Sequence, residues 1–130
     1  MEKDEPHGRG RIITPSGMLF EGNFVEGLKI GKGRMVLGNG DIYEGEFQDN
    51  FPNGRGMYKS VEKDCTFVGE FKNAKIQRGR QSFIDGTYYV GEFEDWEREG
   101  KGEYHSGDGD YFEGTFVKGQ LSGKGKKIFF

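Results

Sequence analysis

Tyr43-Glu44-Gly45-Glu46-Phe47 decides how this chain folds, because the same pattern recurs four more times along it. Each copy consists of an aromatic residue, a variable residue, glycine, a second variable residue and phenylalanine. The other copies begin at Phe20, Phe67, Tyr89 and Phe112, so consecutive copies start 23, 24, 22 and 23 residues apart. Such self-similarity predicts a repeat architecture, in which stacked units bury a continuous core and recurring surfaces carry the function.

The pattern has the period of a β-strand. Side chains alternate between the two faces of a strand, so Tyr43, Gly45 and Phe47 share one face while Glu44 and Glu46 share the other. The middle glycine leaves a gap between two rings and allows a neighbouring backbone to come close. We therefore expect each copy to be a strand with an aromatic face and a mostly polar face.

A pair of glycines follows four of the five motifs, seven and nine residues after the final phenylalanine. The pairs are Gly31/Gly33, Gly54/Gly56, Gly100/Gly102 and Gly123/Gly125. The six residues before each pair, such as residues 48–53, are turn-like, and glycine allows the chain to return tightly. We expect a turn there, a short second strand after the pair, and a second turn at triplets such as Gly38-Asn39-Gly40. The chain is thus predicted to be an all-β antiparallel meander.

An aromatic-x-Gly-x-Phe core followed by Gly-x-Gly at this period closely resembles the MORN repeat (membrane occupation and recognition nexus). The resemblance covers the chain from about Gly8 to Phe130. It implies an elongated, single-layer, twisted antiparallel β-sheet of successive hairpins. It also implies a module for protein binding and assembly, as in ciliary and cytoskeletal scaffolds, junctional membrane proteins and accessory modules of enzymes.

The recurrences divide the chain into one partial repeat and five complete ones. We expect a partial N-terminal repeat or cap over residues 1–19, and five repeats over residues 20–42, 43–66, 67–88, 89–111 and 112–130. His7-Gly8-Arg9-Gly10 matches the second half of a repeat, so the chain opens in mid-repeat. That opening is either a natural half-repeat cap or the start of a piece of a longer protein.

The third repeat departs from the pattern. Counted back from Tyr89, Gly79 holds the second position of the glycine pair, Gln77 replaces the first, and one residue is missing before it. The second repeat carries one extra residue in Val61-Glu62-Lys63-Asp64. We therefore expect a local kink or loosened strand pairing near residues 60–80.

The aromatic stripe is the first candidate site. A single-layer sheet has no opposite layer to cover its rings, so we expect some to stay exposed along a groove that binds a partner helix or extended peptide. Carboxylates at the rim favour a partner with basic residues. The groove residues are Phe20, Phe24, Tyr43, Phe47, Phe67, Phe71, Tyr89, Phe93, Phe112 and Phe116. The alternative is that the rings only hold the sheet together.

Two basic clusters are the second candidate site, and they predict a peripheral membrane module as the alternative function. The possible contacts to anionic phospholipids are Lys72, Lys75, Arg78, Arg80, Lys124, Lys126 and Lys127. The alternative is that the basic clusters are only solvated surface without a ligand. The acidic run around residues 92–99 would also repel anionic lipids. A third hypothesis is that the chain is a regulatory module of a larger enzyme.

Trp96 lies in the turn of the fourth repeat, inside that acidic run. It could anchor a partner or fold back over a neighbouring hairpin. Asp108, Asp110 and Glu113 resemble a calcium loop only loosely, and the glycines around them explain this segment as a turn. His7 and His105 are far apart in sequence, so we expect no metal and no cofactor.

Composition narrows the remaining choices. The net charge is −3, which does not provide the positive field of a nucleic-acid binder. The single cysteine, Cys65, fits a reducing compartment, so we expect a cytoplasmic protein, with the resemblance pointing to the cytoskeleton or a cilium. No phosphate-loop or nucleophile-elbow motif is present, and we expect no catalysis. The open edges of the sheet predict a monomer or an edge-to-edge homodimer.

Overall fold

The computed structural model describes the backbone of residues 8–128 and the side chains of residues 8–121. In this range the chain is all-β and contains no helix. The strands are β1 (Gly8–Ile13), β2 (Leu19–Val25), β3 (Leu28–Val36), β4 (Ile42–Gln48), β5 (Phe51–Ser60), β6 (Cys65–Lys72), β7 (Lys75–Phe83), β8 (Tyr88–Glu94), β9 (Glu97–His105), β10 (Tyr111–Val117) and β11 (Gln120–Ile128).

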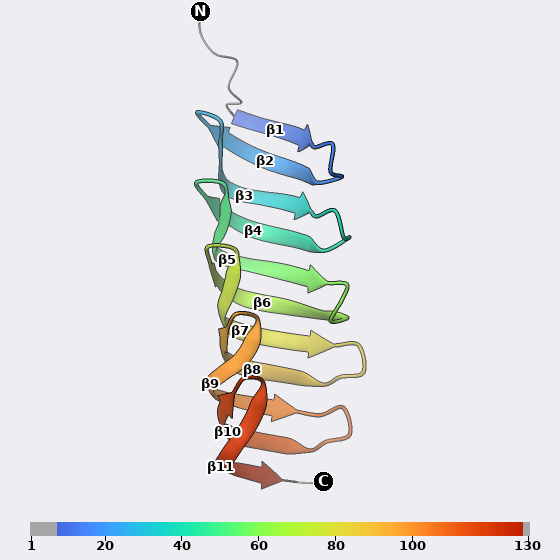
Figure 1. Cartoon of the computed structure of the whole chain (residues 1–130), viewed down its shortest axis with the longest axis vertical. Helices are drawn as coiled ribbons and strands as arrows, with labels where there is room; N and C mark the ends of the chain where they lie inside the picture. The colour runs from blue at the N-terminus through green and yellow to red at the C-terminus, as the bar shows by residue number, and fades with distance from the viewer. Residues whose placement is uncertain (1–7, 129–130) are drawn as a thin grey trace, which may run out of the picture.

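The strands form one open antiparallel sheet, in which each strand pairs only with its neighbours in sequence. The first and last strands lie at opposite ends of the long axis (Figure 1). The five motifs are the even-numbered strands, and the glycine pairs lie on the odd-numbered strands that follow them. The predicted all-β, single-layer sheet of successive hairpins is therefore confirmed.

The turn after each motif is much shorter than the six residues that we expected. Only two residues connect each even strand to the next odd strand, and both have positive φ, as in type I′ turns. At Asp49 and Asn50, for example, φ is 49° and 81°. The other four turns are residues 26–27, 73–74, 95–96 and 118–119. The glycine pairs consequently lie inside the second strand rather than in the turn.

Glycines form one continuous row across the sheet. The middle glycine of each motif is paired with the second glycine of each pair, so that Gly45 lies between Gly33 and Gly56. The full row is Gly10, Gly22, Gly33, Gly45, Gly56, Gly69, Gly79, Gly91, Gly102, Gly114 and Gly125. Without side chains in this row, the backbones leave a furrow in which rings can lie.

The aromatic rings occupy that furrow. A Cβ added at Gly33 would come within 2.9 Å of the Phe20 ring, and one added at Gly56 would overlap Tyr43. In the first, second and fourth motifs, the first ring also contacts the phenylalanine of its own motif and that of the next. The ring of Tyr43 lies 5.2 Å from Phe47 and 5.1 Å from Phe71, in edge-to-face geometry.

The expectation that rings of the stripe stay exposed is wrong for nine of the ten. Their exposed fractions are at most 5%: Phe20, Phe24, Tyr43, Phe47, Phe67, Phe71, Tyr89, Phe93 and Phe116. Phe112 is half-buried. The physical reason is that β-bulges at the glycine pairs bend the odd strands, and the hairpin tips curl across the sheet (Figure 1). Rings of successive repeats then cover one another without a second layer.

Strand pairing within hairpin β6–β7 of the third repeat is not loosened, contrary to expectation. Hairpin β6–β7 has eight paired positions, against six in β4–β5. Its bulge is shorter, because Gln77 alone separates the Glu70–Arg78 and Phe71–Ile76 pairs. Since Phe71 pairs with Ile76 as Phe47 pairs with Pro52, Gln77 corresponds to Asn53. The residue missing from this repeat is therefore the first glycine of the pair, which in β5 is Gly54.

Candidate binding surfaces

The exposed part of the ring-bearing face is supplied by the odd strands. Met35 pairs with Phe20 and Tyr43, while Tyr104 pairs with Tyr89 and Phe112, so these side chains lie in the same row as the buried rings. Four apolar side chains of this row are half-buried and pack on the core: Ile12, Met35, Tyr58 and Tyr104. We call them the odd-strand strip. The fifth position of the row is Gln81, which is buried.

Trp96 folds back over neighbouring hairpins, one of the two arrangements that the sequence left open. Its ring lies 4.7 Å from Tyr58, 5.1 Å from Phe67 and 6.1 Å from Phe71. It is half-buried and has φ of 69°, an unusual conformation for so bulky a residue. Next to it in the turn, Asp95 pairs with Lys75 at 2.7 Å. Trp96 thus extends the odd-strand strip beside Tyr58.

Buried polar groups lie on both sides of Trp96. Asp41 accepts hydrogen bonds from the Tyr58 hydroxyl and, at 2.8 Å, from the Val61 backbone N–H. Burial alone would raise the pKa of Asp41, but these hydrogen bonds outweigh it and hold the pKa below its usual value. Burial, followed by the hydrogen bond to Asp41, raises the pKa of Tyr58. The Asp41 carboxylate is therefore ionised at neutral pH.

A second polar group connects the third and fourth repeats. Arg98 Nε donates to Gln81 Oε1 at 3.1 Å, and Gln81 Nε2 lies 3.4 Å from Cys65 Sγ. The Arg98 guanidinium also lies 5.4 Å from the centre of the Tyr89 ring and 5.2 Å from that of Tyr104. Burial raises the pKa of the Cys65 thiol, so this cysteine is a structural group rather than a reactive one.

The opposite face carries charges of alternating sign. Lys32 is paired with Glu46, and the next strands place Arg55, Glu70, Arg78 and Glu92 side by side. This order arises because the motif strands carry glutamates at their variable positions and the odd strands carry lysine and arginine. Neighbouring charges of opposite sign leave no extended field on this face.

The basic cluster at Lys72, Lys75, Arg78 and Arg80 is interleaved with acidic and aromatic groups. Lys75 is paired with Asp95, and Arg78 lies between Glu70 and Glu92 across the strands. The Arg80 guanidinium lies 4.0 Å from the centre of the Tyr88 ring. These four residues therefore do not form a purely basic surface. The side chains of Lys124, Lys126 and Lys127 lie outside the described part of the structure.

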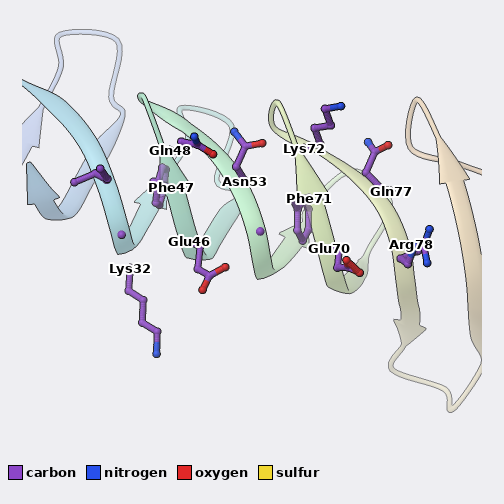
Figure 2. Close-up of a pocket in the computed structure, with 13 residues that line it drawn as sticks. Lys32, Glu46, Phe47, Gln48, Asn53, Glu70, Phe71, Lys72, Gln77 and Arg78 are labelled. Carbon is purple, nitrogen blue, oxygen red and sulfur yellow. The ribbon is translucent and has the colours of Figure 1, made fainter.

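A hollow of about 870 Å³ opens on this charged face between β3 and β7. Figure 2 shows Gln48, Asn53, Lys72 and Gln77 toward the hairpin tips, with Lys32, Glu46 and Glu70 on the other side of the hollow. Its lining mixes both signs of charge with amides and with apolar groups such as Phe47 and Phe71, so it does not select one class of ligand.

Sequence reasoning missed an aromatic ladder on the charged face. Tyr88, His105 and Tyr111 lie side by side on β8, β9 and β10. Tyr88 and His105 stack at 4.4 Å, and the His105 and Tyr111 rings are 4.8 Å apart. Tyr88 and Tyr111 directly precede a motif, whereas His105 lies on the odd strand between them, so only the cross-strand register could reveal the row.

Two further findings concern the residues that the structure describes. No three histidine, cysteine, aspartate or glutamate side chains among them are placed to hold a metal ion. Nor do they include a helix that could span a membrane.

The repeat pattern and the glycine row are also recognised by a family model. The MORN repeat model matches residues 1–19, 20–42, 43–64, 89–111 and 112–130. The chain belongs to the MORN-repeat family. The matches leave out residues 65–88, which hold the shortened bulge of the third repeat. The resemblance inferred from the motifs is therefore confirmed.

Other comparisons add little to this MORN-repeat assignment. No curated protein matches the chain. Among solved structures, the chain is similar to the TCP domain of SAS-4 (dCPAP) of Drosophila melanogaster, which was solved in complex with a proline-rich motif of Ana2 (dSTIL). The identity is 13%, the TM-score is 0.34, and the alignment covers 100% of this chain and 97% of that one.

Proposed function

We propose that this MORN-repeat protein is a non-catalytic scaffold module that binds a partner protein along the odd-strand strip. The observation that carries this proposal is the row of half-buried apolar side chains on the ring-bearing face: Ile12, Met35, Tyr58 and Tyr104. A row of partly exposed apolar groups on a rigid sheet suits an amphipathic helix or an extended peptide.

The proposed contact differs from the buried aromatic stripe. A ring such as Tyr43, with an exposed fraction of 0%, offers nothing to a partner, whereas Met35 in the adjacent strand is accessible. Membership of the MORN family supports a role in assembly, and we propose a cytoskeletal or ciliary setting. The stripe and glycine row then serve to hold the strip at fixed spacing.

The chain offers a matched pair of substitutions that tests this proposal. Met35 lies on the ring-bearing face of β3, and Met57 lies on the charged face of β5. We expect Met35→Lys to weaken partner capture from cell lysate about tenfold or more, and Met57→Lys to leave it unchanged, because only Met35 lies on the strip. Circular dichroism and urea unfolding first establish that both variants are folded.

The partner enriched by the wild type would then be produced and its dissociation constant measured for all three proteins. Weaker binding by folded Met35→Lys alone supports the strip. Weaker binding by Met57→Lys alone would move the contact to the charged face and overturn the proposal. Equal binding by both variants would also overturn it.

A further inference from the structure

A hollow of about 320 Å³ lies beside Trp96 on the ring-bearing face. It is formed where the β3–β4 loop, the β5–β6 loop and the β8–β9 turn meet over β5 and β6. Its lining combines three carboxylates, three aromatic rings, two hydroxyls and one ammonium group. These residues are Asp41, Tyr58, Ser60, Glu62, Lys63, Phe67, Asp95 and Trp96. We call it the Trp96 hollow.

Asp41 is the unusual member of this lining. Only 6% of its surface is exposed, and its carboxylate accepts hydrogen bonds from Tyr58 and Val61. None of the ion pairs found among the described residues includes Asp41. Buried carboxylates are normally compensated by a cation, and each carboxylate oxygen can accept a further hydrogen bond. The hollow thus presents an ionised, buried acid without a cationic partner.

The rings beside Asp41 suit a cation as well. The Trp96 and Tyr58 rings are 4.7 Å apart and tilted by 52°, and Trp96 is held there in a positive-φ conformation. Faces of tryptophan and tyrosine attract cations, and the attraction grows when water is excluded. The rings and the carboxylate therefore favour the same kind of ligand.

The charges around the hollow also favour a cation. Asp41, Glu62 and Asp95 all line the hollow, and Asp95 is already paired with Lys75. Lys63 is the one basic residue of the lining, and it forms none of the ion pairs in the described part of the chain. With three carboxylates and one ammonium group, the lining keeps a net negative charge.

We propose that the Trp96 hollow binds an arginine side chain of the partner that lies along the odd-strand strip. This inference rests on the proposed function, because Tyr58 belongs to both the strip and the hollow. A guanidinium suits the hollow better than an ammonium does, since its plane stacks on aromatic rings while its edge donates to a carboxylate. Asp41 pairs with the positive charge of the guanidinium, and the rings of Tyr58 and Trp96 stack against its plane.

The site can be tested without knowing the partner. Trp96 is the only tryptophan of the chain, so its fluorescence reports directly on the hollow. The probe is N-acetyl-arginine amide, and N-acetyl-citrulline amide is the neutral control of nearly the same shape. We expect a saturable change in Trp96 emission with the arginine probe, with a dissociation constant in the millimolar range, and at least tenfold weaker binding of the citrulline probe.

Two substitutions locate the binding. Asp41→Asn removes the buried charge, and Glu103→Gln makes the same change on the opposite face of the sheet. We expect Asp41→Asn to weaken binding of the arginine probe at least tenfold and Glu103→Gln to leave it unchanged. Equal responses to the two probes, no saturable response at all, or undiminished binding by Asp41→Asn would each overturn the proposal.

This test is independent of the test of the strip. If Met35→Lys abolishes partner binding while the arginine probe does not bind, the strip stands and the arginine site fails. If the probe binds through Asp41 while Met35→Lys leaves partner binding intact, the hollow is a site for arginine and the strip is wrong.

Discussion

The second and third repeats seat their first aromatic ring in different ways. In the second repeat Tyr43 lies over Gly45 and Gly56, and its ring contacts Phe47 of the same motif. In the third repeat the atoms nearest to a Cβ added at Gly69 or Gly79 belong to the facing backbone, not to a ring. The ring of Phe67 instead contacts Trp96 and Phe93, both from the fourth repeat.

One missing residue explains this difference. Without the counterpart of Gly54, the bulge in β7 contains one extra residue, Gln77. The ring of Phe67 does not lie against Gly69 and Gly79 as the ring of Tyr43 lies against Gly45 and Gly56. Trp96 covers Phe67 from the next hairpin, so the shortened bulge and the turn tryptophan are parts of one local departure. The comparison indicates that the length of the bulge determines whether the first ring of a repeat packs on its own glycines or under a ring of the next repeat.

The largest expected effect comes from filling the furrow of the second repeat. Gly56→Ala would place a Cβ against the buried Tyr43 ring, whose hydroxyl is held by the Glu46 carbonyl at 2.8 Å. We expect the free energy of unfolding to fall by about 2–3 kcal/mol, as for overpacked cores. Urea unfolding followed by circular dichroism measures it.

Gly38→Ala is the control for this substitution, since Gly38 lies in an exposed loop and its added Cβ would meet only the Ser16 carbonyl, at 3.1 Å. We expect a change below about 1 kcal/mol there. A Gly56→Ala variant as stable as Gly38→Ala would show that the ring does not depend on the furrow.

The next largest effect concerns Trp96, which covers the Phe67 ring of the third repeat. Trp96→Ala removes the ring that packs on Tyr58, Phe67 and Phe71. Because Trp96 is half-buried, we expect a loss of roughly 2 kcal/mol, less than the 3–5 kcal/mol of a fully buried aromatic residue. Val61→Ala, at a position that is 58% exposed, serves as the control and should be nearly neutral in the same unfolding experiment.

A smaller effect tests whether the two departures are coupled. Inserting a glycine between Gln77 and Arg78 restores the spacing of the second repeat and should reopen the furrow for Phe67. Trp96→Ala should then cost less in the insertion variant than in the wild type, by about 1 kcal/mol, since residues that share a contact are not additive. A double-mutant cycle with urea unfolding measures the coupling. Additive costs would mean that bulge length and Trp96 are unrelated.

Much of the fold could be predicted because its signals are local and repeated. Alternation within Tyr43–Phe47 placed the aromatic and polar faces, and the recurrence predicted the meander. The position of the glycine pair within the strand could not be predicted, since it depends on two-residue turns that have little sequence signature at Asp95-Trp96 or Asn73-Ala74. For the same reason, the sequence placed the missing residue of the third repeat before Gln77, whereas the register places it after Gln77.

The candidate sites were harder to predict, because exposure depends on how successive repeats cover one another. Alternation places Phe47 on the aromatic face, but only the bent strands bring it within 4.9 Å of the Phe20 ring and bury both. Asp41 reads in the sequence as one more aspartate in a glycine-rich turn, and only the cross-strand register brings Tyr58 to it. Composition and spacing contain no information on such contacts between repeats.

The smallest effect is a pH dependence that distinguishes Asp41 from the exposed acids of the same sheet. Its folded pKa is depressed, so its stabilising contribution is complete above the unfolded value of about 3.9 and is lost as the pH falls through the folded value. The wild type should therefore exceed Asp41→Asn in stability at about pH 6, and this gap should close as the pH falls through the folded pKa. Urea unfolding over a series of pH values measures the gap, and Glu103→Gln, at an exposed position on the opposite face, is the control. A gap that widens in acid would mean that the Asp41 carboxyl is stabilising in its protonated form, and a partner cation would then have no buried charge to meet.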